Sequence, residues 1–189
     1  MDSYFDIKAL PNPEITESTV VSHLMQQLHR FLASYRGRIG LDYPGYRKPN
    51  SLGGVIRILG ARLDLEAMHN ALTQSLEVGG YGFVTPISAI PEDITKHARY
   101  TRVHSKGTSR LRRLKKRHQA AGTWSKELET VAAEKFSELI NLPHIKLKST
   151  STGQQFLLFI NRSVLKKPVT GSFNSYGLSH SGKATVPRF

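Results

Sequence analysis

The sequence predicts an α+β protein with two parts, a ferredoxin-like first half and a strongly basic second half. In the first half, segments with strand and helix spacing follow one another as βαββαβ, which is the ferredoxin-like order. The charge changes near Pro91: of the 27 Lys and Arg, 8 lie in residues 1–93 and 19 in residues 94–189. Of the 14 Asp and Glu, 10 lie before this point and 4 after it. We therefore predict a ferredoxin-like domain over residues 1–93 and a basic α/β domain over residues 94–189.

The elements of the first half follow from the spacing of their apolar residues. "SYFDIKAL" alternates and ends at "PNP", which predicts a strand with a stop. From Thr16 to Tyr35 large apolar residues recur every three or four positions, which predicts an amphipathic helix. The remaining elements are, in order, a strand at "RIGLDY", a strand at "GGVIRILGA", a helix at "LDLEAMHNAL" and a strand at "YGFVTPISAI".

The second half begins with a strand at "RYTRVHS" that leads into a basic helix. This helix, Ser109 to Gly122 ("SRLRRLKKRHQAAG"), has only Leu111 and Leu114 as large apolar residues, and cations fill most of its circumference. The further elements are a helix from Ser125 to Ile140, two strands around the turn in "HIKLKSTSTGQQFLLFIN", and extended pieces at "GSFNSYGLS" and "KATVPRF".

The cations of the basic helix need a partner other than the protein core, because two leucines bury little area. Residues 139–189 contain no Asp or Glu, and a field so one-sided repels itself unless a polyanion relieves it. This charge predicts nucleic acid as the partner. A solvated basic surface, or one that contacts an acidic membrane, is the alternative.

The composition excludes several classes of protein. The chain has no cysteine, so disulfides and cysteine-ligated metals are excluded, and a reducing cytoplasmic location fits. We expect a soluble protein, since no signal peptide and no membrane-spanning run is present. The basic half has only four Glu and the histidines have no pair at helical ligand spacing, so we expect neither a metal nor another cofactor.

Several residues are candidates for chemistry, each with a structural alternative. His29 lies at the edge of the apolar face of the first helix, either as a packed histidine or as a general acid or base. The turn "KSTSTGQQF" is either an ordinary polar hairpin or a place for a phosphate or sugar. Phe156 either belongs to the core or stacks on a base. Tyr176 of "SYGLS" is either a buried tyrosine with a hydrogen-bond partner or a residue of the site.

These pieces occur together in a known family. The sequence resembles the CRISPR-associated endoribonucleases of type I-F systems, which cut the repeat hairpins of precursor transcripts into guide RNAs. The resemblance covers nearly the whole chain and rests on "MDSYFDIK", "LHRFL", "RVHSK" followed by "RLRRLKKRH", "STSTGQQFLLFI" and "SYGLS". Each motif is weak alone, but their order across 189 residues is specific.

The resemblance implies a catalytic set. His29 would be the general base that deprotonates the 2′-hydroxyl beside the scissile phosphate, in a reaction that needs no metal. Ser149 would hold that ribose, and Tyr176 would orient the imidazole. Ser151 and Thr152 would lie near the same phosphate.

The resemblance also implies how RNA is bound. Arg102 would read the guanine at the base of the stem, and Phe156 would stack beneath the last base pair. The basic helix would lie in the major groove of the hairpin, with Arg113, Lys116 and Arg117 at the family's arginine positions. We also expect Arg110 and Arg112 of this helix to bind RNA. Partners would be the repeat RNA or guide RNA and the other subunits of a type I-F effector complex. The protein would be a monomer outside that complex, with no membrane partner.

Two departures from the family pattern stand out. His104 occupies the position of a Gln that can make two hydrogen bonds to adenine, whereas His can make one. The basic helix is one residue shorter and has more Lys, so fewer of its contacts are forked. The rival interpretation is a non-catalytic RNA-hairpin-binding subunit of a ribonucleoprotein complex. A subunit of a guide-RNA complex that recognises the hairpin but cleaves poorly is a third.

Overall fold

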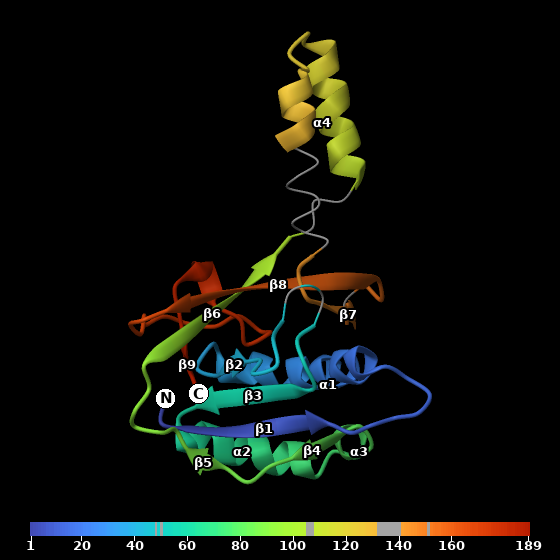
Figure 1. The fold of residues 1–189 in the computed structure, drawn as a ribbon. Helices are drawn as coiled ribbons and strands as arrows, with labels where there is room; N and C mark the ends of the chain where they lie inside the picture. The colour runs from blue at the N-terminus through green and yellow to red at the C-terminus, as the bar shows by residue number, and fades with distance from the viewer. Residues whose placement is uncertain (48, 50, 105–107, 132–140, 151) are drawn as a thin grey trace.

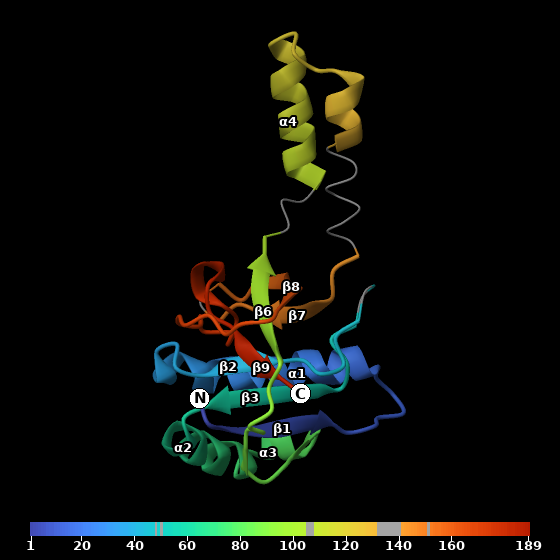
Figure 2. The same cartoon turned by 60° about the vertical axis from the view of Figure 1, so that its left-hand side comes forward.

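Two antiparallel sheets make up the body of the protein (Figures 1 and 2). The computed structural model describes residues 1–47, 49, 51–104, 108–131, 141–150 and 152–189. In the first sheet the strands follow the order β2-β3-β1-β4, and the short β5 also pairs with β1. The bounds of these strands are β1 Ser3–Ala9, β2 Gly40–Asp42, β3 Val55–Gly60, β4 Gly82–Val84 and β5 Ser88–Ala89.

The first sheet and its helices have the ferredoxin-like topology. Helix α1 (Glu17–Leu32) connects β1 to β2, and α2 (Arg62–Thr73) connects β3 towards β4. Thr16 caps α1, since its side-chain oxygen accepts from the backbone N–H of Thr19. A 3₁₀ turn, Ala33–Tyr35, extends the helix to the predicted end. The order β2-β3-β1-β4 with antiparallel neighbours confirms the α+β class and the βαββαβ prediction.

The structure differs from the sequence prediction at the last part of this half. "YGFVTPISAI" was expected to form one strand, but β4 and β5 are separate. Pro86 lies between them and has no backbone N–H to donate to β1, so the ladder breaks there. A short helix, α3 (Leu76–Gly79), was not predicted; Ser75 caps it.

The second sheet has the order β7-β8-β6-β9, again with antiparallel neighbours. Its strands are β6 Lys96–Val103, β7 His144–Lys148, β8 Gln155–Leu165 and β9 Val186–Arg188. The segment "GSFNSYGLS" is not an extended piece as predicted. It bends back on itself, with an isolated bridge between Phe173 and Ser179 and a hydrogen-bonded turn between them.

One apolar core extends through both sheets. Phe5 and Ile58 of the first sheet belong to the same buried cluster as Leu158 and Ile160 of the second. Helix α1 joins the sheets, because the side chains of Ser22 and Gln26 accept hydrogen bonds from backbone N–H groups of β7. The domain boundary near Pro91 stays a prediction: the sheets change between Ala89 and Lys96, but their core is continuous.

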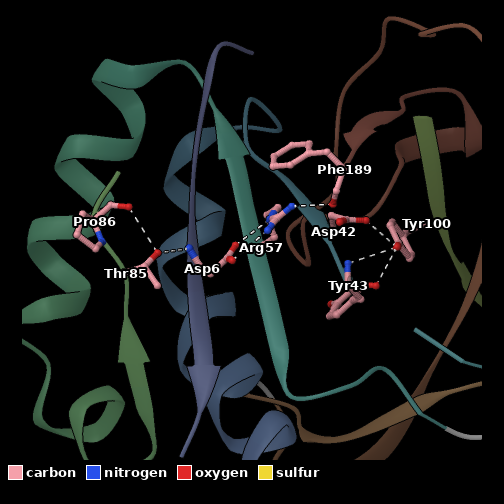
Figure 3. Close-up of polar contacts among 8 residues, drawn as sticks. All are labelled: Asp6, Asp42, Tyr43, Arg57, Thr85, Pro86, Tyr100 and Phe189. Carbon is pink, nitrogen blue, oxygen red and sulfur yellow. Dashed lines mark hydrogen bonds and ion pairs between the residues drawn. The ribbon is translucent and has the colours of Figure 1, made fainter. Parts of the chain in front are cut away.

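A buried polar group also connects the sheets (Figure 3). The hydroxyl of Tyr100 on β6 donates to Oδ1 of Asp42 on β2 at 2.7 Å and accepts from the backbone N–H of Tyr43 at 3.3 Å. Arg57 of β3 makes two hydrogen bonds to the carboxylate of Asp6 on β1 and one to the backbone oxygen of Phe189. The C-terminus is therefore held against the first sheet, where the ring of Phe189 also packs edge-on against Tyr4 of β1 with centroids 4.8 Å apart.

Burial raises the pKa of the Asp42 carboxyl, although the Tyr100 hydrogen bond and the charge of Arg57 oppose the rise. A carboxyl whose pKa is higher when folded binds its proton more tightly in the folded state. Stability therefore falls as pH rises from about 3.9 through the raised pKa. Asp42→Asn, which keeps an acceptor for Tyr100, is expected to lack this fall of at most about 1.4 kcal/mol per pH unit. Urea unfolding of both proteins between about pH 4 and 7 measures this fall in the free energy of unfolding. Parallel curves of stability against pH for the two proteins would contradict the prediction.

Helix α4 (Thr108–Ala120) is the predicted basic helix, and it projects from the body as a rod (Figures 1 and 2). Residues 126–131 form a helical segment beside it, which is the described part of the helix predicted from Ser125 to Ile140. The ammonium of Lys115 bonds Oε1 of Glu129 at 2.7 Å and lies 5.4 Å from the centroid of Trp124. The side chains of Leu111 and Leu114, the two large apolar residues of this helix, lie outside the described part.

Candidate active site

A pocket of about 200 Å³ surrounds His29 where α1 meets the second sheet. Four segments contribute to it: the last turns of α1, the end of β7 with its following turn, the start of β8, and the loop before residue 179. We call it the His29 pocket; its lining residues are Gln26, His29, Leu147, Lys148, Ser149, Thr150, Phe156, Ser175 and Tyr176. Four of the predicted site residues are thus in one place: His29, Ser149, Phe156 and Tyr176.

The imidazole of His29 is half-buried and held in one orientation. Its Nδ1 lies 2.7 Å from the backbone oxygen of Ser175. A carbonyl oxygen can only accept, so Nδ1 carries the hydrogen of this bond. In the neutral ring the lone pair is then on Nε2, which can act as a base. The packed-histidine and general-base interpretations are therefore compatible, since packing fixes the ring that would do the chemistry.

An aromatic group lies beside this imidazole. The Tyr176 ring stacks on His29 with centroids 4.2 Å apart and planes at 10°. Phe156 meets Tyr176 edge-on at 6.5 Å. The guanidinium carbon of Arg102 is 5.5 Å from the centroid of Phe156 and 5.7 Å from that of Tyr176, within cation–π range. These contacts hold Arg102 next to the pocket rather than over open solvent.

The turn between β7 and β8 brings Ser149 to the pocket. The backbone N–H of Ser149 donates to Gln154 O and its own oxygen accepts from Gly153 N, both at 2.9 Å. Gly153 has a φ of +68°, which a side chain would strain, so the tight turn requires glycine there. Thr152 is exposed and is not among the residues that line the pocket. Ser151 lies outside the described residues.

A second pocket, of about 390 Å³, adjoins the first on the far side of the Tyr176 loop. Arg102 and His104 line it, together with Ser175 and Tyr176. Arg102 projects from β6 opposite Ile160 of β8, and His104 follows the end of that strand. The pair predicted to read bases thus shares a hollow that is separated from His29 by one tyrosine ring.

The predicted cations of the basic helix lie away from both pockets. Arg113, Lys116 and Arg117 are exposed on α4, while Lys115 is paired with Glu129. The side chains of Arg110 and Arg112 lie outside the described part of the chain. Helix α4, which projects from the body in Figure 1, therefore offers charge along a surface, whereas the two pockets lie in the body.

No group of three or more His, Asp or Glu side chains is placed to hold a metal ion within the described ranges. Among the helices that the structure describes, none is long and apolar enough to cross a membrane.

Comparison with known proteins identifies the family. The family model described as "CRISPR-associated protein (Cas_Csy4)" matches residues 4–189. The chain belongs to this family. A relative from Escherichia coli (strain UTI89 / UPEC), named "CRISPR-associated endonuclease Cas6/Csy4", is 34% identical over 194 residues that cover 100% of both chains. A second relative of that name, from Pseudomonas aeruginosa (strain UCBPP-PA14), is 32% identical over 192 residues, covering 96% of this chain and 97% of its own.

Membership of the Cas_Csy4 family confirms the resemblance drawn from the sequence motifs. The structure adds pocket residues that those motifs did not single out. Gln26 lies one helical turn before His29, and its side-chain oxygen accepts from Lys148 N at 2.7 Å. The spacing of three residues on one helix face is the signal that points to Gln26. Ser175 acts through its backbone oxygen, for which no side-chain pattern exists.

Proposed function

We propose that this protein is a metal-independent endoribonuclease that cuts the repeat hairpins of CRISPR precursor transcripts and then holds the guide RNA. The observation that carries the proposal is the orientation of His29, whose Nδ1 donates to Ser175 O and leaves Nε2 available. A histidine with an available nitrogen near neutral pH suits the removal of a proton from a ribose hydroxyl.

The reaction is an internal transesterification. Nε2 of His29 takes the proton of the 2′-hydroxyl, the 2′-oxygen bonds to the neighbouring phosphorus, and the bond from phosphorus to the 5′-oxygen breaks. The leaving 5′-oxygen gains a proton from solvent water, and His29 returns the proton it took to the solvent, so the protons balance. One product then ends in a 2′,3′-cyclic phosphate, or the 3′-phosphate formed when it opens, and the other begins with a 5′-hydroxyl. In this scheme the hydroxyl of Ser149 holds the ribose for in-line attack, and Tyr176 keeps the imidazole in place by stacking.

Binding divides between the body and the rod. Arg102 and Phe156 meet the base pair nearest the cut, with His104 beside them, while Ser151 and Thr152 approach the scissile phosphate. The cations of α4 meet the phosphates of the stem. A product held by so many phosphate contacts leaves slowly. The remaining subunits of a type I-F effector complex would then assemble on this protein, which we propose is a monomer until that step.

The test is a repeat hairpin with a single 2′-deoxy nucleotide before the cut. We expect complete protection, because the attacking oxygen is absent, while the all-ribose hairpin is cut in EDTA as fast as in Mg²⁺. The products are identified by their cyclic phosphate and 5′-hydroxyl ends. Cleavage of the deoxy substrate would exclude the 2′-hydroxyl mechanism, and loss of cleavage in EDTA would exclude metal independence. A protein that binds both RNAs and cuts neither would be the non-catalytic subunit.

A further inference from the structure

The peptide group between Ser175 and Tyr176 is hydrogen-bonded at both ends. Its carbonyl oxygen accepts from Nδ1 of His29 at 2.7 Å. Its N–H, which belongs to Tyr176, donates to Oδ1 of Asn174 at 2.9 Å. A trans peptide group is planar and directs its C=O and N–H to opposite sides, so holding the N–H also fixes the direction of the carbonyl.

The side chain of Asn174 is itself well placed to hold this group. Its Oδ1 accepts a second hydrogen bond from Leu178 N at 3.2 Å. The backbone of Asn174 donates to Leu178 O at 2.8 Å and accepts from Gly177 N at 2.9 Å. Leu178 is fully buried. The Asn174 side-chain oxygen therefore closes a compact turn whose far end is the buried Leu178. Asn side chains commonly stabilise turns in this way.

The turn is also fixed to both sheets. Leu41 N on β2 donates to Gly177 O at 2.9 Å, and Ser179 N donates to Tyr100 O on β6 at 2.8 Å. Gly177 has a φ of +67°, and a Cβ on it would lie 2.4 Å from Cγ of Leu41. The ends of the turn are thus set by the sheets. The direction of the one peptide that faces His29 is set within the turn, by Asn174.

We propose that Asn174 is a positioning residue that selects the Nδ1–H tautomer of His29 through the Ser175–Tyr176 peptide. Its effect on cleavage rests on the proposed role of His29 as the base. The hydrogen bonds run in one line from Asn174 Oδ1 through the peptide to the ring, and each polarises the next. An imidazole with its hydrogen fixed on Nδ1 always presents the Nε2 lone pair to the ribose.

The first experiment measures the ring alone, without RNA. NMR of the ¹⁵N-labelled protein at a pH where His29 is neutral reports which nitrogen carries the hydrogen. We expect Nδ1–H in the wild type and in Asn174→Asp, which keeps an acceptor oxygen. Asn174→Ala is expected to show a mixture of the two tautomers. If the Ala variant keeps the wild-type tautomer, or the Asp variant loses it, the proposal is wrong.

The second experiment measures cleavage and binding separately. Single-turnover cleavage by Asn174→Ala is expected to fall about tenfold, the effect of losing one orienting hydrogen bond. The dissociation constant of the hairpin is expected to change less than about twofold, because Asn174 carries no charge and its Oδ1, although the residue lines the second pocket, is bonded to the backbone of its own turn. Asn174→Asp is expected to recover most of the rate. A loss of affinity that matches the loss of rate would contradict a positioning role.

The chain offers a matched control in Asn12. Its Oδ1 also accepts from two backbone N–H groups, those of Glu14 at 2.8 Å and Ile15 at 3.2 Å, in the loop before α1. Asn12→Ala is expected to lose similar stability in thermal unfolding while cleaving at the wild-type rate. An equal fall in rate for both Ala variants would assign the effect to general loosening of the fold and overturn the proposal.

The two experiments separate this proposal from the proposed function. If His29→Ala cuts as fast as the wild type while Asn174→Ala still changes the tautomer, His29 is not the base but Asn174 does position it. If His29→Ala is inactive while His29 keeps the same tautomer in Asn174→Ala as in the wild type, the proposed function stands and the positioning role of Asn174 fails.

Discussion

His29→Ala is expected to abolish hairpin cleavage and to leave hairpin affinity unchanged. The ring supplies the base in the proposed reaction, and general base catalysis contributes about 10²–10⁴-fold to a rate. His29 lies in its pocket, away from the cations of α4 that would bind the phosphates of the stem, so its removal should not weaken binding. Single-turnover cleavage of a labelled repeat measures the rate, and a filter-binding titration measures the affinity. A variant that still cuts at the wild-type rate would remove His29 from the mechanism.

His23 provides the control for this substitution. It lies on the same helix and also packs against a tyrosine, Tyr81, with centroids 4.2 Å apart. The six positions between His23 and His29 place it on a different face of α1. His23→Ala therefore removes an imidazole and a ring contact of the same kind without reaching the His29 pocket. We expect wild-type cleavage from it once any loss of stability is allowed for.

Removing two cations from α4 is expected to weaken hairpin binding about a hundredfold and to make it less sensitive to salt. Lys116 and Arg117 are both exposed on the rod. A hydrogen bond to a charged phosphate contributes about 1.5–3 kcal/mol, so each residue is worth at least about tenfold. Each phosphate contact also contributes about one unit to the slope of log K against log salt. The double Ala variant should lose about two units, measured by titrations between roughly 50 and 200 mM salt.

Lys115→Ala is the matched variant on the same helix. The ammonium of Lys115 is already paired with Glu129 and lies over Trp124. It releases few counterions on RNA binding, so its removal should change the slope by much less than one unit. Equal slopes for the wild type and the double variant would mean that α4 does not lie on phosphates.

The sequence predicted the parts of the fold that depend on repeated spacing. The alternation of "SYFDIKAL" and the apolar recurrence of α1 each continue over two or more turns or pleats, so one unusual residue cannot hide them. The break between β4 and β5 and the bend of residues 173–179 were missed because each depends on one or two backbone groups. Pro86 interrupts a ladder, and Asn174 closes a turn; neither produces a period.

The candidate site was predictable only in part for a related reason. His29, Ser149, Phe156 and Tyr176 are side chains in short motifs, and motifs carry over from a family. Which of them touch depends on how α1 crosses β7, and no local pattern contains that crossing. The stacked pair of His29 and Tyr176 joins residues 147 positions apart, and the group that orients the imidazole is a main-chain carbonyl.

The walls of the His29 pocket come from helix α1 of the first half and from β7, β8 and a loop of the second half, and a single apolar interior runs beneath them. Neither half of the chain can therefore be exchanged between related proteins without altering this pocket. A recombination event that replaced one sheet with that of a distant relative would have to preserve the contacts between α1 and β7. Otherwise the hybrid protein would lose the proposed cleavage while still binding RNA. For this architecture the whole chain, rather than either half, is the smallest unit on which selection for cutting can act.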